Sequence, residues 1–313
     1  MLRATAGTVL SSVASRQQLA GAAGRSLSLY RDNAMTDLPG PLTPTQTSTI
    51  GGLYAETFVP PGTPKGVVVI THGYAEHCGR YHEVAHVIVN AGWAALSYDV
   101  RGHGKSPGER GYIDRFDTYL NDLAAVQAAA RALVSEGAPM ILLGHSHGSL
   151  ITLRALASSS PPAIKAAIVS SPFLALKLAV PGYKKLLAKV ASRIAPKLAQ
   201  PNSLRVEDLT HDRAKQAERT ADKLCFDVAT SRWFTEASAA QDYVLAHASR
   251  ITVPTTWLVG ADDPIADPAR SRTVADKVAG ARYHDLAGMK HEVFNEVDRA
   301  KVFAELTRTL ASA

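Results

Sequence analysis

The pentapeptide Gly-His-Ser-His-Gly at residues 144–148 is the feature of this sequence best suited to covalent chemistry. An apolar run at 140–143 precedes it, and apolar residues at helical spacing follow from 150 to 156. This pattern predicts a strand, a sharp turn and a helix. Such a turn holds its serine at positive φ and lifts the hydroxyl clear of the backbone. Ser146 could therefore attack a carbonyl carbon, provided that a base and an acid reach it from elsewhere in the chain.

The sequence offers a candidate acid and a candidate base downstream of the serine. Asp262 and Asp263 stand just past one predicted strand, and His291 stands just past the next. In parallel sheets that carry a serine on such a turn, the acid follows the serine in the chain and the histidine comes last. We therefore assign Asp263 and His291, with Asp262 as the rival acid. His284 is the rival base, but it lies inside its strand.

A tetrahedral intermediate also needs hydrogen-bond donors for its negatively charged oxygen. The backbone N–H of His147, directly after the serine, is one candidate donor. The second donor should come from the loop after an earlier strand, and we nominate the backbone N–H of Tyr74. Loss of one such donor typically costs about 3–4 kcal/mol of transition-state stabilisation.

Two further motifs compete with this interpretation. Gly-Lys-Ser-Pro-Gly at 104–108 repeats the Gly-x-Ser-x-Gly pattern, but proline follows its serine and has no N–H to donate. The same stretch resembles the end of a phosphate-binding loop, except that Asp99 occupies the position of the first glycine. His-Glu-Val-Ala-His at 82–86 matches a zinc-protease signature, but no third ligand is evident. We predict a half-exposed helix with two surface histidines there, and no metal or cofactor for the protein.

The elements that must position these residues alternate between strand and helix. This alternation predicts an α/β fold with a mainly parallel sheet and helices on both faces. The segment 172–248 breaks the alternation with no convincing strand, so we predict a helical insertion over the carboxyl ends of the strands. The predicted strands span 53–59, 66–71, 93–100, 140–143, 166–169, 251–259 and 283–286. The main predicted helices span 80–90, 116–134 and 291–310, and another begins at Asp267 and Pro268; Val297, Phe303, Leu306 and Leu310 face inward in the last one.

Composition places the chain among globular proteins with a sizeable core, since 46% of its 313 residues are hydrophobic and 20% are charged. No apolar run is long enough to span a bilayer. The net charge of +6 is uneven, because residues 1–31 hold four arginines and no acid, and this argues against a nucleic-acid partner for the nearly neutral body. Two cysteines do not make a disulfide framework, so we expect reduced thiols in the cytoplasm.

The sequence divides into an extension, a core and an insertion. We predict a disordered extension at 1–40, a core at 41–171 and 249–313, and a helical cap at 172–248. Residues 1–34 are rich in arginine and serine, as in mitochondrial targeting peptides, but their amphipathic period is poor. That favours a plain extension, or a start codon read too early with Met35 as the true start.

Five segments together make the chain resemble the monoacylglycerol lipase and lysophospholipase branch of the α/β-hydrolases, also grouped with serine aminopeptidase-like hydrolases. They are His-Gly-Tyr-Ala-Glu-His-Cys-Gly-Arg-Tyr at 72–81, Asp-Val-Arg-Gly-His-Gly-Lys-Ser at 99–106, residues 260–264 with the serine pentapeptide, and His-Glu-Val-Phe-Asn-Glu at 291–296. The resemblance implies an α/β-hydrolase fold with a cap. It also implies a triad of Ser146, Asp263 and His291, with Tyr74 and His147 as oxyanion donors. The family usually has methionine in place of His147, a difference that we expect to change the polarity of the pocket.

The segment 172–206 bears on the substrate, because it has seven basic residues and no acid among many leucines. A basic amphipathic segment can rest on an anionic membrane and pass single-chain lipids inward. The alternative is a helix that packs its apolar face on the core. With the resemblance, we expect a serine hydrolase of single-chain lipid esters, with transient contact between cap and membrane. Its rivals are a carboxylesterase, a peptidase, an acyltransferase, or a hydrolase fold that only binds a ligand.

Overall fold

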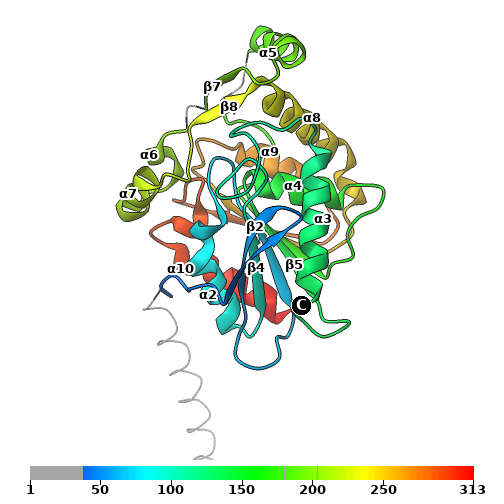
Figure 1. Ribbon diagram of the computed structural model, residues 1–313, viewed down its shortest axis with the longest axis vertical. Helices are drawn as coiled ribbons and strands as arrows, with labels where there is room; N and C mark the ends of the chain where they lie inside the picture. Colours follow the sequence, from blue (N-terminus) through cyan, green and yellow to red (C-terminus); the bar gives the residue numbers. More distant parts are fainter. Residues whose placement is uncertain (1–37, 179–180, 203) are drawn as a thin grey trace, which may run out of the picture. The chain divides into compact units, whose positions relative to one another are not determined.

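A computed structural model describes residues 38–178, 181–202 and 204–313 (Figure 1). The interpretations of residues 1–34, and nearly all of the predicted extension, lie outside the described residues. Residues Gly40–Ala313 form one compact unit. Among the described residues, no helix is both long enough and apolar enough to cross a bilayer.

An eight-stranded, mainly parallel sheet forms the centre of this unit, as predicted. The strand order is β1-β2-β4-β3-β5-β6-β9-β10, in which β2 pairs antiparallel with both β1 and β4, and every pair from β4 along to β10 is parallel. The edge strand β1 was not predicted, because its residues are polar and mostly exposed. The strand bounds are β1 Gln46–Ile50, β2 Leu53–Phe58, β3 Val67–Thr71, β4 Ala94–Tyr98, β5 Met140–His145, β6 Ala166–Ser170, β9 Thr255–Gly260 and β10 Ala281–Leu286.

Both faces of the sheet are buried under helices. In β3, Val67 and Val69 belong to one buried cluster, while Val68 and Ile70 belong to the other. This two-residue alternation is what a strand covered on both faces requires, and it accounts for the continuous apolar runs in the sequence. One cluster includes side chains of α3 (Asp117–Arg131) and α4 (His147–Leu156), and the other includes side chains of α2 (His82–Asn90) and α10 (Arg299–Ala311). Helix α9 (Pro268–Ala275) begins at Asp267 and Pro268, as predicted.

The insertion (residues 172–248) connects the neighbouring strands β6 and β9 and lies beyond one end of the sheet (Figure 1). The expectation that it contains no strand is wrong, because β7 and β8 pair antiparallel. Each of these strands has only three residues, too few for a periodic pattern, and their pairing spans about thirty residues of sequence. The bounds are α5 Gly182–Ile194, β7 Ala199–Pro201, α6 Val206–Leu209, α7 Arg213–Ala221, β8 Val228–Thr230 and α8 Ser231–His247.

The last helix begins later than the sequence suggested. The predicted helix at 291–310 is instead a loop with one 3-10 turn at Val293–Asn295, followed by α10. The buried carboxylate of Glu296 causes this, because it accepts hydrogen bonds from the backbone N–H groups of Lys290, His211 and Val297 and so fixes a non-helical path. The Val297 side chain, expected to face inward, is 60% exposed. The three apolar positions further along the predicted helix are buried, as expected.

Candidate active site

Ser146 lies on the sharp turn between β5 and α4, with φ 49° and ψ −112°. This positive φ was predicted from the pentapeptide, and two glycines make the turn possible. A Cβ on Gly144 would come within 2.6 Å of the Gly148 carbonyl carbon, and a Cβ on Gly148 would overlap the Thr71 carbonyl oxygen. Larger residues at either position would push the helix away from its strand and displace the serine.

The Ser146 hydroxyl, the His291 imidazole and the Asp263 carboxylate form one hydrogen-bonded chain. Nε2 of His291 lies 2.9 Å from Oγ of Ser146, and Nδ1 of His291 lies 2.7 Å from Oδ2 of Asp263. Because a carboxylate only accepts, Nδ1 carries the proton and Nε2 is free to accept from the serine. The other oxygen of Asp263 accepts from the backbone N–H groups of Ile265 and Ala266, and this fixes the carboxylate in its loop.

Burial and charge act on His291 in opposite directions. Burial alone would lower the pKa of the imidazole, but the neighbouring Asp263 carboxylate, assisted by Glu292 and Glu76, raises the pKa above its ordinary value. The neighbouring His145 ring, 5.0 Å away between centroids, has a pKa lowered to about 4 by burial and by His291. His145 is therefore neutral near pH 7, whereas His291 is stabilised in the cation that forms when it takes a proton.

The two rivals from the sequence lie outside this chain of hydrogen bonds. The Asp262 side chain is exposed to solvent. His284 lies in the edge strand β10, with Nδ1 3.6 Å from a carboxylate oxygen of Glu305 on α10. The structure thus brings Asp263 and His291 to the serine and leaves Asp262 and His284 elsewhere.

The two nominated oxyanion donors flank the serine. His147 is the first residue of α4, and a Cβ built on Gly73, just before Tyr74, would be 3.4 Å from the Ser146 Cβ. Within the described ranges, neither the Tyr74 N–H nor the His147 N–H donates a hydrogen bond to the protein. Both groups are thus free to donate to an oxygen beside the serine.

The expectation that His147 changes the polarity of the pocket is wrong. Its side chain is absent from the cavity wall and fully buried among aromatic rings, including Tyr74, Tyr119 and Trp233. Burial lowers the pKa of the imidazole to about 3. Because this side chain is buried and does not line the cavity, only the backbone of His147 is available beside Ser146.

A cavity of about 750 Å³ opens beside Ser146 and His291. Trp233 of the insertion stacks on Tyr74 of the core, with ring centroids 3.8 Å apart, and both rings line the cavity. The rest of its wall is largely apolar and comes mainly from the insertion, including Leu187, Val190, Ile194, Leu198 and Phe234. The arrangement places the Ser146 hydroxyl and the His291 imidazole beside a space suited to an apolar chain.

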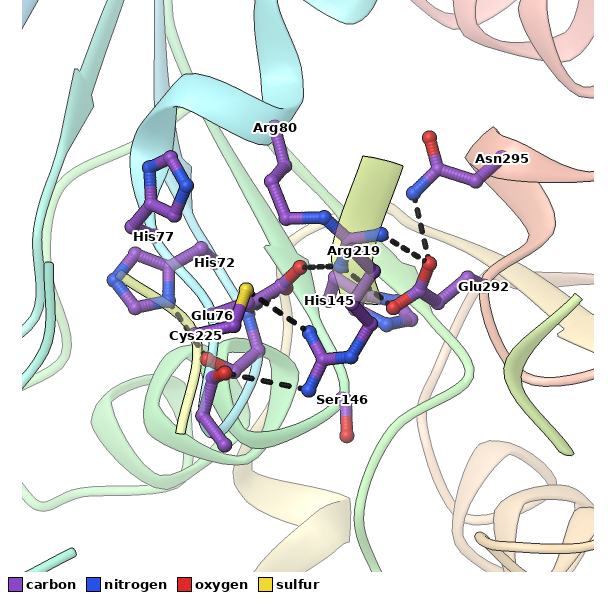
Figure 2. A network of polar contacts seen from close by, with 12 residues as sticks. His72, Glu76, His77, Arg80, His145, Ser146, Arg219, Cys225, Glu292 and Asn295 are labelled. Carbon is purple, nitrogen blue, oxygen red and sulfur yellow. Dashed lines mark hydrogen bonds and ion pairs between the residues drawn. The ribbon is translucent and has the colours of Figure 1, made fainter. Parts of the chain in front are cut away.

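Sequence reasoning missed a buried ionic cluster on the polar side of this cavity (Figure 2). Arg80 binds Glu76 at 2.6 Å and Glu292 at 2.7 Å, and Asn295 donates to Glu292 at 3.0 Å. All four residues lie inside segments that carried the family resemblance, but they are distant in sequence. Their spacing alone did not reveal that they meet.

The competing motifs have structural partners in the fold. The serine of the second Gly-x-Ser-x-Gly stretch, Ser106, donates to the Asp99 carbonyl oxygen at 2.6 Å and accepts from the Tyr54 N–H. In the His-Glu-x-x-His stretch, His82 contacts Glu56 at 2.7 Å, while Glu83 pairs with basic residues of α7 and α10. Ser106 is buried, His82 and Glu83 are partly buried, and all three hold elements of the fold together.

A different group, His77, Asp222 and Cys225, has ligand atoms within 4.8 Å of one another. Nδ1 of His77 accepts from the Gly79 N–H, so Nε2 carries the proton and donates to Asp222 at 2.6 Å. The Arg219 guanidinium lies 3.5 Å from the thiol. The protonated Nε2 of His77 and the adjacent Arg219 guanidinium both oppose the binding of a metal ion. The contact between His77 and Asp222 is therefore a hydrogen bond that joins the core to the insertion.

Comparisons with known proteins place the chain in a family. The family model for serine aminopeptidase, S33, matches residues 62–298. The monoacylglycerol lipase of Mycolicibacterium smegmatis is 30% identical over 84% of this chain and 95% of its own length. The phospholipase YtpA of Bacillus subtilis is 28% identical over 77% of this chain and 93% of its own. The crystal structure of Paleococcus ferrophilus monoacylglycerol lipase, 29% identical, superposes with a TM-score of 0.75 over 83% of this chain and 98% of that one.

Because the family model matches residues 62–298 and a relative that is 30% identical covers 84% of the chain, the protein belongs to the serine aminopeptidase S33 family of α/β-hydrolases.

Proposed function

We propose that this α/β-hydrolase cleaves carboxylic esters of single-chain lipids, such as monoacylglycerols, with Ser146 as nucleophile. The observation that carries the proposal is that the His291 imidazole is hydrogen-bonded to both Ser146 and Asp263 at the wall of an apolar cavity. This arrangement supplies a base for the serine and an acid that fixes the tautomer of that base.

The reaction follows from the positions of these groups. Oγ of Ser146 bonds to the ester carbonyl carbon while its proton passes to Nε2 of His291, and the N–H groups of Tyr74 and His147 stabilise the oxyanion. The tetrahedral intermediate collapses, the C–O bond to the alcohol breaks, and His291 returns the proton to the departing alcohol. Water then attacks the acyl-enzyme with His291 again as base, and this releases the fatty acid and restores the serine.

The shape of the cavity supports an ester with one long acyl chain. The cavity has a largely apolar wall and a polar side near the serine with Glu76, Arg219 and Glu292. An acyl chain suits the apolar wall, and a small alcohol such as glycerol suits the polar groups. Relatives named monoacylglycerol lipase and phospholipase support the same class of substrate.

A substrate panel tests this proposal. We expect kcat/KM for long-chain monoacylglycerols or lysophospholipids to exceed that for an acetyl ester by about 100-fold or more, because each buried methylene adds about 0.8 kcal/mol. Aminoacyl amides serve as the peptidase comparison at matched concentration. Faster cleavage of the amides, or equal rates for acetyl and long-chain esters, would contradict a lipid ester as the substrate.

We also propose that α5 brings the protein into transient contact with anionic membranes. Its apolar side chains are largely exposed, with Leu186 64%, Leu187 61% and Ile194 79% accessible to solvent. Lys184, Lys189 and Arg193 lie on the same helix, and none forms an ion pair with the described residues. An apolar stripe flanked by unpaired cations suits the surface of a bilayer, and the same helix lines the cavity.

Replacing Lys184, Lys189 and Arg193 together by glutamine should weaken binding to anionic vesicles about 100-fold, since each basic residue near such a surface contributes about 1 kcal/mol. Sedimentation with phosphatidylserine-containing vesicles measures this. Hydrolysis of a short, dissolved ester should be unchanged. A control variant replaces Lys165, Lys277 and Lys301, which lie outside the insertion, by glutamine. Equal vesicle binding by the two triple variants would remove the membrane proposal.

A further inference from the structure

The peptide unit between Gly73 and Tyr74 is oriented by a buried histidine. Nε2 of His72 accepts the Val100 N–H at 2.9 Å, so Nδ1 carries the proton and donates to the Gly73 carbonyl oxygen at 2.7 Å. In a planar trans peptide the C=O and the N–H point to opposite sides. The bond to His72 therefore fixes the direction in which the Tyr74 N–H points, next to Ser146.

The other side of Gly73 is held by Glu76. The Gly73 N–H donates to Oε1 of Glu76 at 2.6 Å, and the Tyr81 hydroxyl donates to the same oxygen at 2.7 Å. Glu76 is only 2% exposed. Burial by itself would raise the pKa of Glu76, but the Arg80 guanidinium holds that pKa well below its ordinary range. Glu76 is therefore a charged hydrogen-bond acceptor at any pH at which the enzyme would be assayed.

Arg80 extends this contact to the loop that carries the base. Its two terminal nitrogens donate to the two oxygens of Glu292, each at 2.7 Å, and one of them also donates to Glu76 at 2.6 Å (Figure 2). Glu292 follows His291 directly in the chain. Despite burial, Arg80 lowers the pKa of Glu292 to about 2, so this carboxylate is charged as well. A continuous path of polar contacts thus runs from the Gly73 amide to the residue beside the imidazole.

Stability alone does not account for such a cluster. Desolvating buried charges is costly, and apolar side chains of similar volume are often at least as stabilising as a buried ion pair. Here the two carboxylates come from separate loops, and each loop carries one part of the reaction site. The fork of one guanidinium fixes both carboxylates in a defined geometry, which a flexible ammonium cannot do.

Resting on the function proposed above, we propose that Arg80 is a positioning residue that, through Glu76 and Glu292, sets the placement of the Tyr74 N–H relative to the His291 imidazole around Ser146. Arg80 touches neither the nucleophile nor the base, and it acts through its two carboxylate partners. We expect Arg80 to stabilise the transition state and not the bound substrate, because the oxyanion donor and the base must act together only in the transition state.

The test replaces Arg80 by lysine, which keeps the charge but can no longer grip both carboxylates in a fork. We expect kcat for a monoacylglycerol to fall about 10- to 100-fold, because small misplacements of reacting groups have effects of this size. KM should stay within about threefold, because Arg80 does not line the cavity and the apolar wall that holds the acyl chain is unchanged. Glu292→Gln, which preserves side-chain volume, should also lower kcat. It replaces Arg80→Lys in the test if that variant does not fold.

Arg101→Lys is the matched control, because Arg101 makes a similar fork to Asp122, with bonds of 2.9 and 2.7 Å, away from the cavity. It should leave kcat unchanged. Wild-type kcat in folded Arg80→Lys and Glu292→Gln, or a rise in KM at constant kcat, would overturn the positioning role. An inactive wild-type protein would instead count against the proposed function, so the two failures are distinguishable.

Discussion

Replacing Ser146 by alanine is expected to lower kcat for ester hydrolysis about 10⁶-fold, the size of effect seen when a triad nucleophile is removed. The reason is that no acyl-enzyme can form without Oγ, and any remaining rate comes only from the oxyanion donors and substrate binding. Burst and steady-state kinetics with a chromogenic ester measure the loss. The fold should survive, because the positive φ of residue 146 is imposed by the surrounding backbone and the side chain is small.

The second Gly-x-Ser-x-Gly stretch supplies a matched control. Ser106→Ala removes a buried serine from the same sequence pattern, but its hydroxyl contacts only backbone groups of Asp99 and Tyr54. This variant should keep the kcat of the wild type even if its melting temperature falls. If Ser106→Ala abolished hydrolysis and Ser146→Ala did not, the assignment of the nucleophile would be reversed.

Replacing Asp263 by asparagine should lower kcat about 10⁴-fold, as expected when the acid of a triad loses its charge but keeps its shape. An asparagine amide can donate to Nδ1 of His291, which would move the imidazole proton to Nε2 and leave no acceptor for the serine. The side-chain oxygen of the asparagine can still accept from the Ile265 and Ala266 N–H groups, as Oδ1 of Asp263 does, so the conformation of the loop should persist. Single-turnover rates measured against those of the wild type give the size of the effect.

The pH profile of the same variant has a definite sign. In the wild type, Asp263 raises the pKa of His291 against the opposing effect of burial, so kcat/KM should rise with pH as the imidazole loses its proton. Without the carboxylate, burial dominates, and the acid limb of the residual activity should move to lower pH. The control is Asp262→Asn, which changes the exposed residue next to Asp263. It should change neither kcat nor the acid limb of the pH profile. An acid limb that moves to higher pH in Asp263→Asn would contradict the proposed role.

The layout of the core could be predicted because its strands are buried on both faces. The side chains at 67–70 alternate between two helix layers, and all four are fully buried. Edge and insertion strands could not be predicted in this way. β1 has one neighbouring strand and mostly exposed residues, and β7 and β8 are held by distant pairing with little local pattern. The start of α10 was missed because a single buried carboxylate, Glu296, redirects the backbone before it.

The candidate site was predictable to the extent that topology dictates it. Parallel strands end at one edge of a sheet, so a serine after β5, an acid after β9 and a histidine after β10 must gather there. The contacts of Arg80 with Glu76 and Glu292 depend instead on how two loops fold over that edge. Their charges are visible in the sequence, but the partner of each charge is decided by tertiary packing.

Mapping the site of covalent modification tests the central claim most directly. The full-length protein is treated with a fluorophosphonate, digested, and the modified peptide is identified by tandem mass spectrometry. The proton-transfer chain from Asp263 through His291 predicts one rapid adduct, on the peptide that contains Ser146, with much slower formation in Asp263→Asn. An adduct on another serine, or steady ester hydrolysis by a protein that forms no adduct, would contradict the account.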